Sequence, residues 1–410
     1  MEAGRIGRIR RYAELIVRKG VNVQAGQRVV VFADIEAADF ARLVTEAAYD
    51  AGAAHVYVNW SDEAASRTTY LMADPEEFKL VEPWRVEFYK YYDDINACYI
   101  FLDSDDPDLL SDVEPERIYD SSKSSGVAFY DHNNAISCNH VRWTLAGVPS
   151  GAWASKLFPD IPEEEAVELL WEKILDSSRV YGDPLAAWDD HDKMFKEKIR
   201  FLNGAKFSEL RFTNSLGTDI RIGLPQGHFW DGGSNRAKDG VWFFPNIPTE
   251  EVFTLPDCRT VNGRVVASMP LTHNCVTIEN FELIFEGGKV VSYKAEKNEA
   301  ALGNILNLDE GARMLGEVAL VPHDSPISRM KLLFKNSLYD ENASCHFALG
   351  KAYPMIGSYD RSLSKEEADG LGVNDSITHV DFMFGTADLR VTGTTSDGKE
   401  VTVFVNGNWA

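Results

Sequence analysis

The first half of the chain alternates short apolar runs with segments whose apolar residues recur every three to four positions. The runs predict buried strands, and the longer spacing predicts amphipathic helices. A strand, a helix and a second strand within about 30 residues form a βαβ unit, which predicts a parallel sheet. Strands are expected at 28–32, 55–60, 97–102, 126–130 and 142–148, and helices at 6–19, 40–49, 78–91, 162–178 and 188–203.

From residue 207 onward the pattern changes to short strands separated by glycine and asparagine turns. Such spacing predicts hairpins and antiparallel pairing. The strands are expected at 209–213, 220–224, 263–269, 280–285, 290–294, 388–392 and 401–405, with turns at 214–218 and 286–289 and one helix at 309–315.

A length of 410 residues exceeds what one hydrophobic core usually supports. We therefore expect two domains. Residues 1–200 should form an α/β N-terminal domain with a mostly parallel sheet. Residues 201–410 should form an α+β C-terminal domain, rich in antiparallel strands, that binds metal and carries catalysis.

The formal net charge of −23 bears on partners. Phosphate binding needs a basic face, so this charge argues against nucleic acid and against anionic membranes. It suits a protein whose acidic cleft attracts a cationic ligand, such as a free α-ammonium group. No run of about 18 apolar residues is present to span a bilayer.

The five cysteines are scattered and form no CxxC pair. This usage predicts free thiols in a reducing compartment. The first 20 residues lack the uninterrupted apolar region of a signal peptide. The expected location is the cytoplasm.

Three common catalytic or cofactor motifs are missing from the sequence. No GxGxxG follows the first predicted strand, which argues against a dinucleotide site. No HExxH and no GxSxG occur, so the usual marks of zincins and serine hydrolases are also absent.

A proline-bounded segment at 246–256 carries two adjacent glutamates, Glu250 and Glu251. Each proline fixes its own φ and restricts the preceding residue, so a stiff, extended segment is expected. Neighbouring side chains on an extended chain point to opposite faces. One glutamate is then placed to bind a metal, while a turn brings the other near the same site. The plainer interpretation is a solvated acidic surface.

His379 and Asp381 lie two residues apart in a segment that alternates polar and apolar residues. At the strand period of two they share one face, about 7 Å apart at the backbone. That spacing suits two ligands of one metal or of two neighbouring ions. The alternative is an edge strand whose polar face lies in water.

Four more residues extend this set. Glu317 enters the apolar run 318–321, and a buried carboxylate needs a partner such as a metal ion. His346 and Tyr353 are seven residues apart, so either one helix face or a strand and turn brings them together. A core tyrosine and a hydrogen-bonded histidine are the plainer interpretation. Glu341 lies in an Asp-Glu-Asn cluster that is also typical of a loop.

Carboxylates with two imidazoles suit Zn²⁺, Mn²⁺ or Co²⁺ and can hold two ions through bridging carboxylates. From the residues alone, a dinuclear metallohydrolase is the candidate function.

The chain also resembles the thermophilic metalloaminopeptidases, the aminopeptidase T family, over nearly its whole length. The segments that carry the resemblance are NIPTEEVFTLPD, GEVALVPHDSPIS, DENASCHFALGKAY and HVDFMFGT, together with the opening YAELIVRKGVNVQAGQRVVV and WTLAGVPSGAWA. The resemblance implies a homodimeric exopeptidase that removes N-terminal residues from peptides, with two metal ions in the cavity of its C-terminal domain.

Carried over to this sequence, the resemblance implies a set of metal ligands around two divalent ions (Zn, Co, Mn or Mg). The implied ligands are Glu251, Glu317, His346, His379 and Asp381, with Glu341 as a further candidate and Tyr353 at the site.

Two catalytic roles remain open at this point. Glu250 is the candidate base that takes a proton from the metal-bound water, or else it points outward or forms a salt bridge. Tyr353 either donates a hydrogen bond to the tetrahedral oxyanion or ligates a metal through its phenolate. The competing functions are another metal-dependent amidohydrolase and a non-enzymatic two-domain solute-binding protein.

Overall fold

The computed structural model describes residues 2–273, 276–353, 355–358 and 363–410. Contacts divide these residues into two compact units. The first unit runs to His191 and takes in Ser234–Pro248, and the second comprises Asp192–Gly233 and the chain from Thr249 onward. The single boundary expected at residue 200 stays a prediction about separately folding domains.

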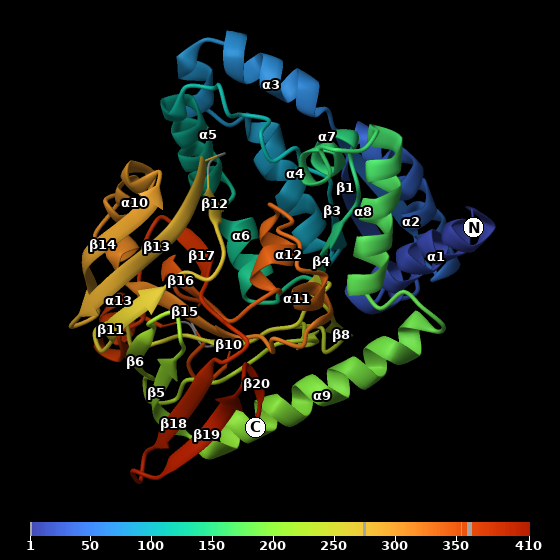
Figure 1. Cartoon of the computed structure of the whole chain (residues 1–410). Coiled ribbons are helices and arrows are strands. Elements are labelled where there is room, and N and C mark those ends of the chain that lie inside the picture. The colour runs from blue at the N-terminus through green and yellow to red at the C-terminus, as the bar shows by residue number, and fades with distance from the viewer. Residues whose placement is uncertain (1, 274–275, 354, 359–362) are drawn as a thin grey trace. The chain divides into compact units, whose positions relative to one another are not determined.

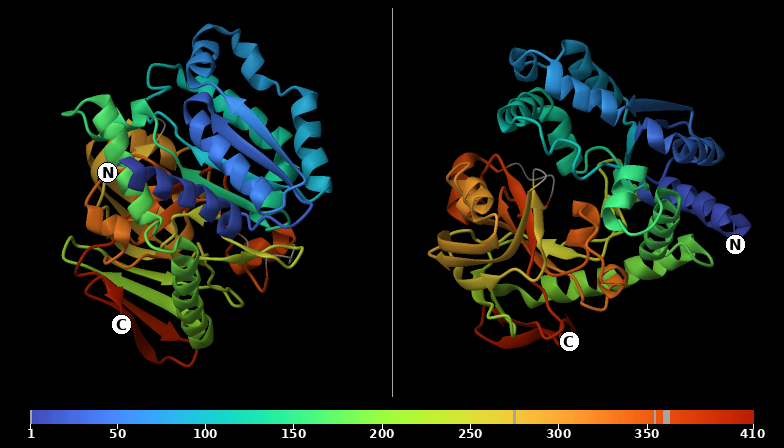
Figure 2. Two further views of the ribbon diagram at one scale, coloured as in Figure 1. Left: turned by 90° about the vertical axis from the view of Figure 1, so that its right-hand side faces the viewer. Right: turned by 45° about the horizontal axis from the view of Figure 1, so that its top comes forward.

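The first unit is built on a parallel sheet with strand order β2-β1-β3-β4-β9. Helices flank this sheet (Figures 1 and 2). The strands are β1 (Arg28–Asp34), β2 (His55–Ser61), β3 (Cys98–Asp103), β4 (Trp143–Gly147) and β9 (Asn246–Ile247). The helices are α1 (Glu2–Leu15), α2 (Ala38–Asp50), α3 (Glu63–Met72), α4 (Pro83–Asp94), α5 (Pro115–Ala128), α6 (Tyr130–Ser137), α7 (Gly151–Leu157) and α8 (Glu163–Ser177). Helix α9 (Pro184–Ala205) crosses the division between the units.

Two predictions in this unit are wrong. Residues 126–130 do not form a strand, because α5 ends at Ala128 and α6 begins at Tyr130. A short apolar run cannot by itself distinguish a strand from a helix. The helix expected from residue 78 begins at Pro83, whose fixed φ favours the first helical turn. A short 3₁₀ helix, Pro75–Lys79, precedes it.

The second unit contains two antiparallel sheets. The larger has the order β12-β13-β11-β6-β5-β18-β19-β20, with β14 paired to β13. Its strands are β5 (Phe207–Thr213), β6 (Asp219–Gly223), β11 (Asn262–Val266), β12 (Leu271–His273), β13 (Val276–Glu286), β14 (Lys289–Lys297), β18 (Arg390–Thr395), β19 (Glu400–Val405) and β20 (Asn408–Trp409). The smaller sheet has the order β10-β15-β16-β17. Its strands are β10 (Val252–Thr254), β15 (Leu315–Leu320), β16 (His346–Gly350) and β17 (His379–Met383).

These two sheets share the apolar core of the second unit. Phe347 of β16 packs edge-on against Phe212 of β5, with ring centroids 5.2 Å apart. Phe382 of β17 lies 5.8 Å from Phe281 of β13. One face of the smaller sheet is therefore committed to the core. The short helices of this unit are α10 (Glu299–Leu306), α11 (Pro326–Met330), α12 (Ser337–Glu341) and α13 (Lys365–Leu371).

The helix expected at 309–315 is also wrong. Only a single 3₁₀ turn, Gly311–Arg313, forms before β15 begins at Leu315. The Asp309 carboxylate accepts the Ala312 N–H, as an N-terminal cap would, but it also accepts the Ser376 hydroxyl and the Ile377 N–H.

The fold class expected from the sequence is confirmed, with a parallel α/β first unit and a mostly antiparallel second unit. In the part of the chain that is described, no helix is both long and apolar enough to cross a bilayer.

Candidate metal centre

Strand register places four of the expected ligands on one face of the smaller sheet. Glu317 of β15 and Asp381 of β17 both pair with Ala348 of β16. Within β16, His346 lies two residues before Ala348, and Gly350, two residues after it, pairs with His379. Paired residues, and residues two apart on a strand, share a face. The two imidazoles and the two carboxylates therefore converge.

The alternate positions of the same strands face the core. Val318, Phe347, Val380 and Phe382 are all at most 4% exposed and belong to the apolar core of the second unit. The polar–apolar alternation of these strands therefore places the apolar side chains on the core face of the sheet and the candidate ligands on the opposite face.

A β-bulge at Gly316 sets this alternation in β15. The register shifts by one residue between Leu315 and Glu317. Leu315 is consequently buried in the core while Glu317, two residues on, faces the ligand side. A Cβ at Gly316 would lie 2.3 Å from the Gly350 carbonyl oxygen and 2.4 Å from that of Lys351, so only glycine fits there.

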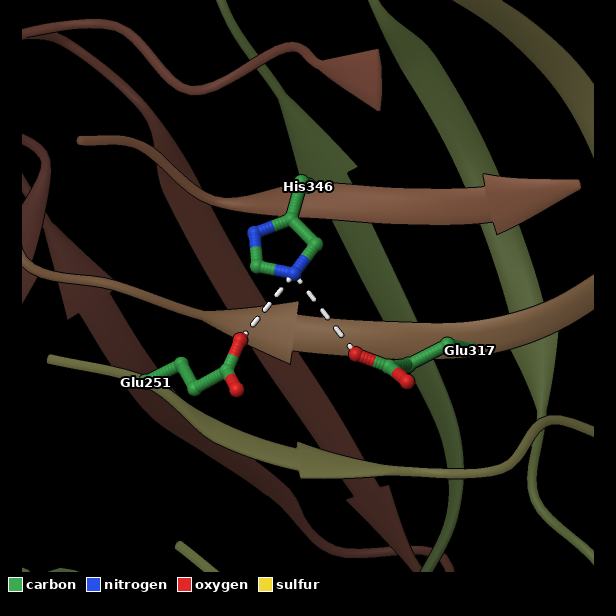
Figure 3. Close-up of side chains that lie close together, drawn as sticks. All are labelled: Glu251, Glu317 and His346. Atoms are coloured by element: carbon green, nitrogen blue, oxygen red, sulfur yellow. Dashed lines mark ion pairs between the residues drawn. The ribbon is translucent and has the colours of Figure 1, made fainter. Parts of the chain in front are cut away.

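Glu251 reaches the same face from the segment before β10. Its Oε2 lies 3.2 Å from His346 Nε2, and Glu317 Oε1 lies 3.6 Å from the same nitrogen (Figure 3). One donor atom from each of these three residues lies within 4.8 Å of the others. This is a spacing that a single metal ion can bridge.

A second group of donors adjoins the first. His379 Nε2 lies 3.8 Å from Glu317 Oε2 and 3.5 Å from Asp381 Oδ1. Glu317 therefore directs one oxygen toward each imidazole. Asp381 Oδ1 is buried, and beyond this ion pair with His379 it accepts no hydrogen bond from the described residues. A buried carboxylate oxygen with one long ion pair as its contact is suited to a cation as a further partner.

Backbone carbonyls fix both imidazole rings. His346 Nδ1 lies 3.1 Å from the Ser344 oxygen, and His379 Nδ1 lies 2.7 Å from the Lys351 oxygen. Because a carbonyl only accepts, each Nδ1 carries the proton. Each Nε2 is thereby turned toward the carboxylates, as in metal-binding histidines.

The carboxylates and imidazoles of this cluster strongly shift one another's pKa values. Burial alone would lower the pKa of His346, but hydrogen bonds to Glu251 and Glu317 raise it well above its usual value. Burial would also lower the pKa of His379. The negative charge of Asp381 outweighs burial and raises this pKa to about 10. Burial raises the pKa of Glu317. An ion bound by these imidazoles would release protons on binding, because a histidine must be deprotonated to act as a ligand.

Glu341 lies at the end of α12 beside this cluster. Burial, together with the charges of Glu251 and Asp381, raises the pKa of the Glu341 carboxyl group well above its usual value.

The neighbouring residue Asp340 has a structural role within its own segment. The Asp340 carboxylate accepts the backbone N–H groups of Phe334 and Asn336.

The two residues expected to act in catalysis differ in exposure. Glu250 is 6% and Glu251 8% exposed, so neither lies on a solvated acidic surface. Tyr353 is 41% exposed and follows the end of β16. Its ring centroid lies 5.5 Å from that of His379. The strand-and-turn arrangement, not one helix face, therefore relates Tyr353 to His346.

The residues that hold the candidate metal ligands in place were not predicted from the sequence. Asn342 accepts the Glu250 N–H, and the Ser344 and Lys351 carbonyls hold the two imidazoles. The last two contacts are made by main-chain oxygens. Because every residue has a main-chain oxygen, the residue types in the sequence could not predict these contacts. Asn342 stood in the Asp-Glu-Asn cluster, but nothing there indicated a contact with a residue 92 positions away.

Known proteins are similar to this chain over almost its full length. The family described as thermophilic metalloprotease (M29) matches residues 7–409. Aminopeptidase 2 of Geobacillus stearothermophilus is 44% identical, covering 98% of this chain and 97% of the relative. Aminopeptidase T of Thermus aquaticus is 38% identical, covering 98% of each.

A solved structure agrees with these sequence relatives. Wild-type AmpT from Thermus thermophilus superimposes with a TM-score of 0.92 at 38% identity, covering 98% of this chain and 99% of that one. The resemblance found in the sequence motifs is therefore confirmed. The chain belongs to the thermophilic metalloprotease family M29 and is an aminopeptidase.

Proposed function

We propose that this aminopeptidase removes the N-terminal residue from peptides with a free α-amino group, using two divalent ions held by the smaller sheet. The observation that carries the proposal is the convergence of five side chains, four from one face of the smaller sheet and Glu251 from the segment before β10, with Glu317 between the two imidazoles. Glu251, Glu317, His346, His379 and Asp381 would hold the ions, and Glu341 is a further candidate ligand.

When bound, the ions would lower the pKa of a water molecule and polarise the scissile carbonyl. The protein's own residues complete the chemistry in this proposal. The Glu250 carboxylate takes the proton from the water and passes it to the leaving amine. Tyr353 either donates its phenolic hydrogen to the oxyanion or acts as a further ligand.

The donor set also limits the choice of metal. Carboxylate and imidazole ligands fit Zn²⁺, Co²⁺ and Mn²⁺, and Mg²⁺ is compatible with the carboxylates. We propose one of these four as the working ion. No thiol joins the cluster among the described residues, because Cys345 points to Val321, whose N–H lies 3.3 Å from its sulfur.

The substrate class follows from charge. A net charge of −23 favours approach of a cationic ligand such as the substrate α-ammonium group. The same charge disfavours nucleic acid and anionic membranes as partners. We further propose a homodimer in the cytoplasm. Among the described residues, the thiols of Cys98, Cys258 and Cys345 form no disulfide, which is compatible with a reducing compartment. Sedimentation at twice the mass of the chain would support the dimer.

A panel of matched peptides tests the reaction. We expect release of the first residue only, from free-amino peptides of two to six residues, and no release from their N-acetylated forms. Cleavage of acetylated peptides, or of dipeptides alone, would favour a different amidohydrolase. The family membership sets the solute-binding alternative aside.

A further inference from the structure

Asn342 connects two acidic segments of the second unit. It follows α12 directly and is 0% exposed. Its Oδ1 accepts the backbone N–H of Glu250 at 2.6 Å. Its Nδ2 donates to the Leu338 carbonyl at 2.8 Å and lies 3.4 Å from Glu341 Oε1. Both ends of one buried amide are therefore engaged.

The contact with Glu250 lies where the sheet does not hold the chain. The β10–β15 ladder begins at the Val252–Leu320 pair, so the backbone of Glu250 and Glu251 precedes it. The side chain of Glu251 must nevertheless stay 3.2 Å from His346 Nε2. A ligand supplied from outside a ladder depends on other contacts for its position.

We propose that Asn342 is a positioning residue, which sets the Glu250–Glu251 segment against Glu341 and so fixes the spacing of the carboxylates around the metal centre. This inference rests on the metal centre proposed above. Asn342 would touch neither metal nor substrate. It would act through the Glu250 N–H, one residue before a ligand and on the candidate base itself.

The cost of removing the amide follows from its burial. Without Asn342 Oδ1 the Glu250 N–H loses an acceptor inside the protein. Because an unsatisfied buried donor costs free energy, we expect the backbone at Glu250 to shift. Loss of a residue that supports a metal ligand typically lowers metal affinity or activity by about 10–100-fold.

A purely structural role is the competing explanation, since Asn342 Nδ2 also caps the Leu338 carbonyl at the end of α12. Asn214 provides a matched control in the same unit. Its Oδ1 accepts the N–H groups of Leu216 and Thr218, and its Nδ2 donates to the Phe384 carbonyl. It therefore makes the same kinds of hydrogen bond without contacting the two glutamates.

The experiment compares Asn342→Ala with Asn214→Ala in the full-length protein. Zn²⁺ affinity, measured by competition with a chelator, is followed together with kcat, KM and melting temperature. We expect Asn342→Ala to lower Zn²⁺ affinity about 10–100-fold and to lower kcat more than it changes KM. Asn214→Ala should lower the melting temperature while leaving Zn²⁺ affinity unchanged. Equal Zn²⁺ affinity and kcat in wild type and a folded Asn342→Ala protein would overturn the proposal.

A second variant separates the helix from the Glu250 contact and guards against misfolding. Leu338→Ala removes a buried side chain from α12 but keeps the Leu338 carbonyl and the Asn342 contact with the Glu250 N–H. We expect its melting temperature to fall while its Zn²⁺ affinity stays near that of wild type. A folded Leu338→Ala protein that loses as much Zn²⁺ affinity as Asn342→Ala would assign the effect to the helix and overturn the proposal. If wild-type protein binds no Zn²⁺, the proposed metal centre itself fails, which is a distinct outcome.

Discussion

At the scale of single residues, the metal centre depends on which atoms are already engaged. The Nδ1 atoms of His346 and His379 are held by main-chain carbonyls, and their Nε2 atoms face carboxylates. Asp381 Oδ1 is buried, and its contact among the described residues is the ion pair with His379 Nε2 at 3.5 Å. Glu250 is buried next to the proposed ligand Glu251, and we propose it as the base.

Replacing the two adjacent glutamates should therefore have different effects, one on kcat and the other on metal affinity. Glu250→Gln removes a proton acceptor while keeping the shape of the side chain. We expect it to retain metal and to lose about 10²–10⁴-fold in kcat, the usual worth of a general base. Glu251→Gln should instead lose metal affinity. Metal content and kcat of the two purified variants check this, and turnover near wild type in metal-loaded Glu250→Gln would refute the assignment of the base.

A second prediction at this scale concerns Glu63 in the first unit. Burial raises the pKa of this carboxyl group to about 7, although the Asp106 N–H opposes the shift. The folded state then binds more protons than the unfolded state between about pH 4.5 and 7, so this group's contribution to stability falls as pH rises through that range.

Glu63→Gln should remove that dependence. Because Glu63 is only half-buried, we expect a gain of about 1 kcal/mol or less at pH 8, or about 2–4 °C in melting temperature. The gain at pH 5 should be clearly smaller, since wild-type Glu63 is then largely neutral in the folded protein. Melting curves of both proteins at the two pH values check this. An equal difference at pH 5 and pH 8 would contradict it.

At the scale of elements, the smaller sheet divides packing from chemistry. The common face of His379 and Asp381 was predictable, because a period of two is visible in the sequence and β17 has it. For the strand containing Glu317, the sequence predicted the buried apolar run that follows this residue but not the start of the strand. Asp309 resembled a helix start, yet its carboxylate binds Ser376 and Ile377 as well as Ala312. The bulge at Gly316 depends on the distant Gly350 and Lys351 carbonyls, which no local pattern encodes.

We propose that a small residue on the face with the candidate ligands keeps space for ions. Ala348 is 0% exposed and lies between Glu317 and Asp381 in the ladder. Ala348→Val adds two methyl groups there, and overpacking of this kind costs about 1–3 kcal/mol. We expect much of that cost to appear as weaker metal binding. Ala295→Val, at a buried strand position in the core of the same unit, is the control. Metal titration of both variants decides, and equal affinities would contradict the role of Ala348.

At the scale of the whole molecule, the candidate ligands all belong to the second unit. The resemblance along the chain predicted the function, and the pattern of apolar residues predicted the two classes of sheet. It did not predict that Ser234–Pro248 returns to the first unit. The strand responsible, β9, has only two residues, Asn246 and Ile247, and so carries no periodicity. Such a strand exists because β4 offers it a parallel edge, which is a tertiary effect.

Metal should therefore stabilise the molecule unevenly. Binding to the folded state alone adds about 2.7 kcal/mol at a free ion concentration one hundred times Kd. We expect added Zn²⁺ to slow amide hydrogen exchange in β10, β15, β16 and β17 while leaving β1 and β3 unchanged. Hydrogen exchange with and without the ion measures this. Uniform slowing across both units would show that the ion acts elsewhere than on the smaller sheet.

The most direct measurement is a metal titration of the chelator-stripped enzyme, with release of the N-terminal residue from a free-amino peptide as the readout. Zn²⁺, Co²⁺, Mn²⁺ and Mg²⁺ are added separately, and bound metal per chain is measured at each point. We predict no activity in the stripped, folded protein and full activity at two ions per chain. Full activity without metal, or saturation at one ion per chain, would contradict it.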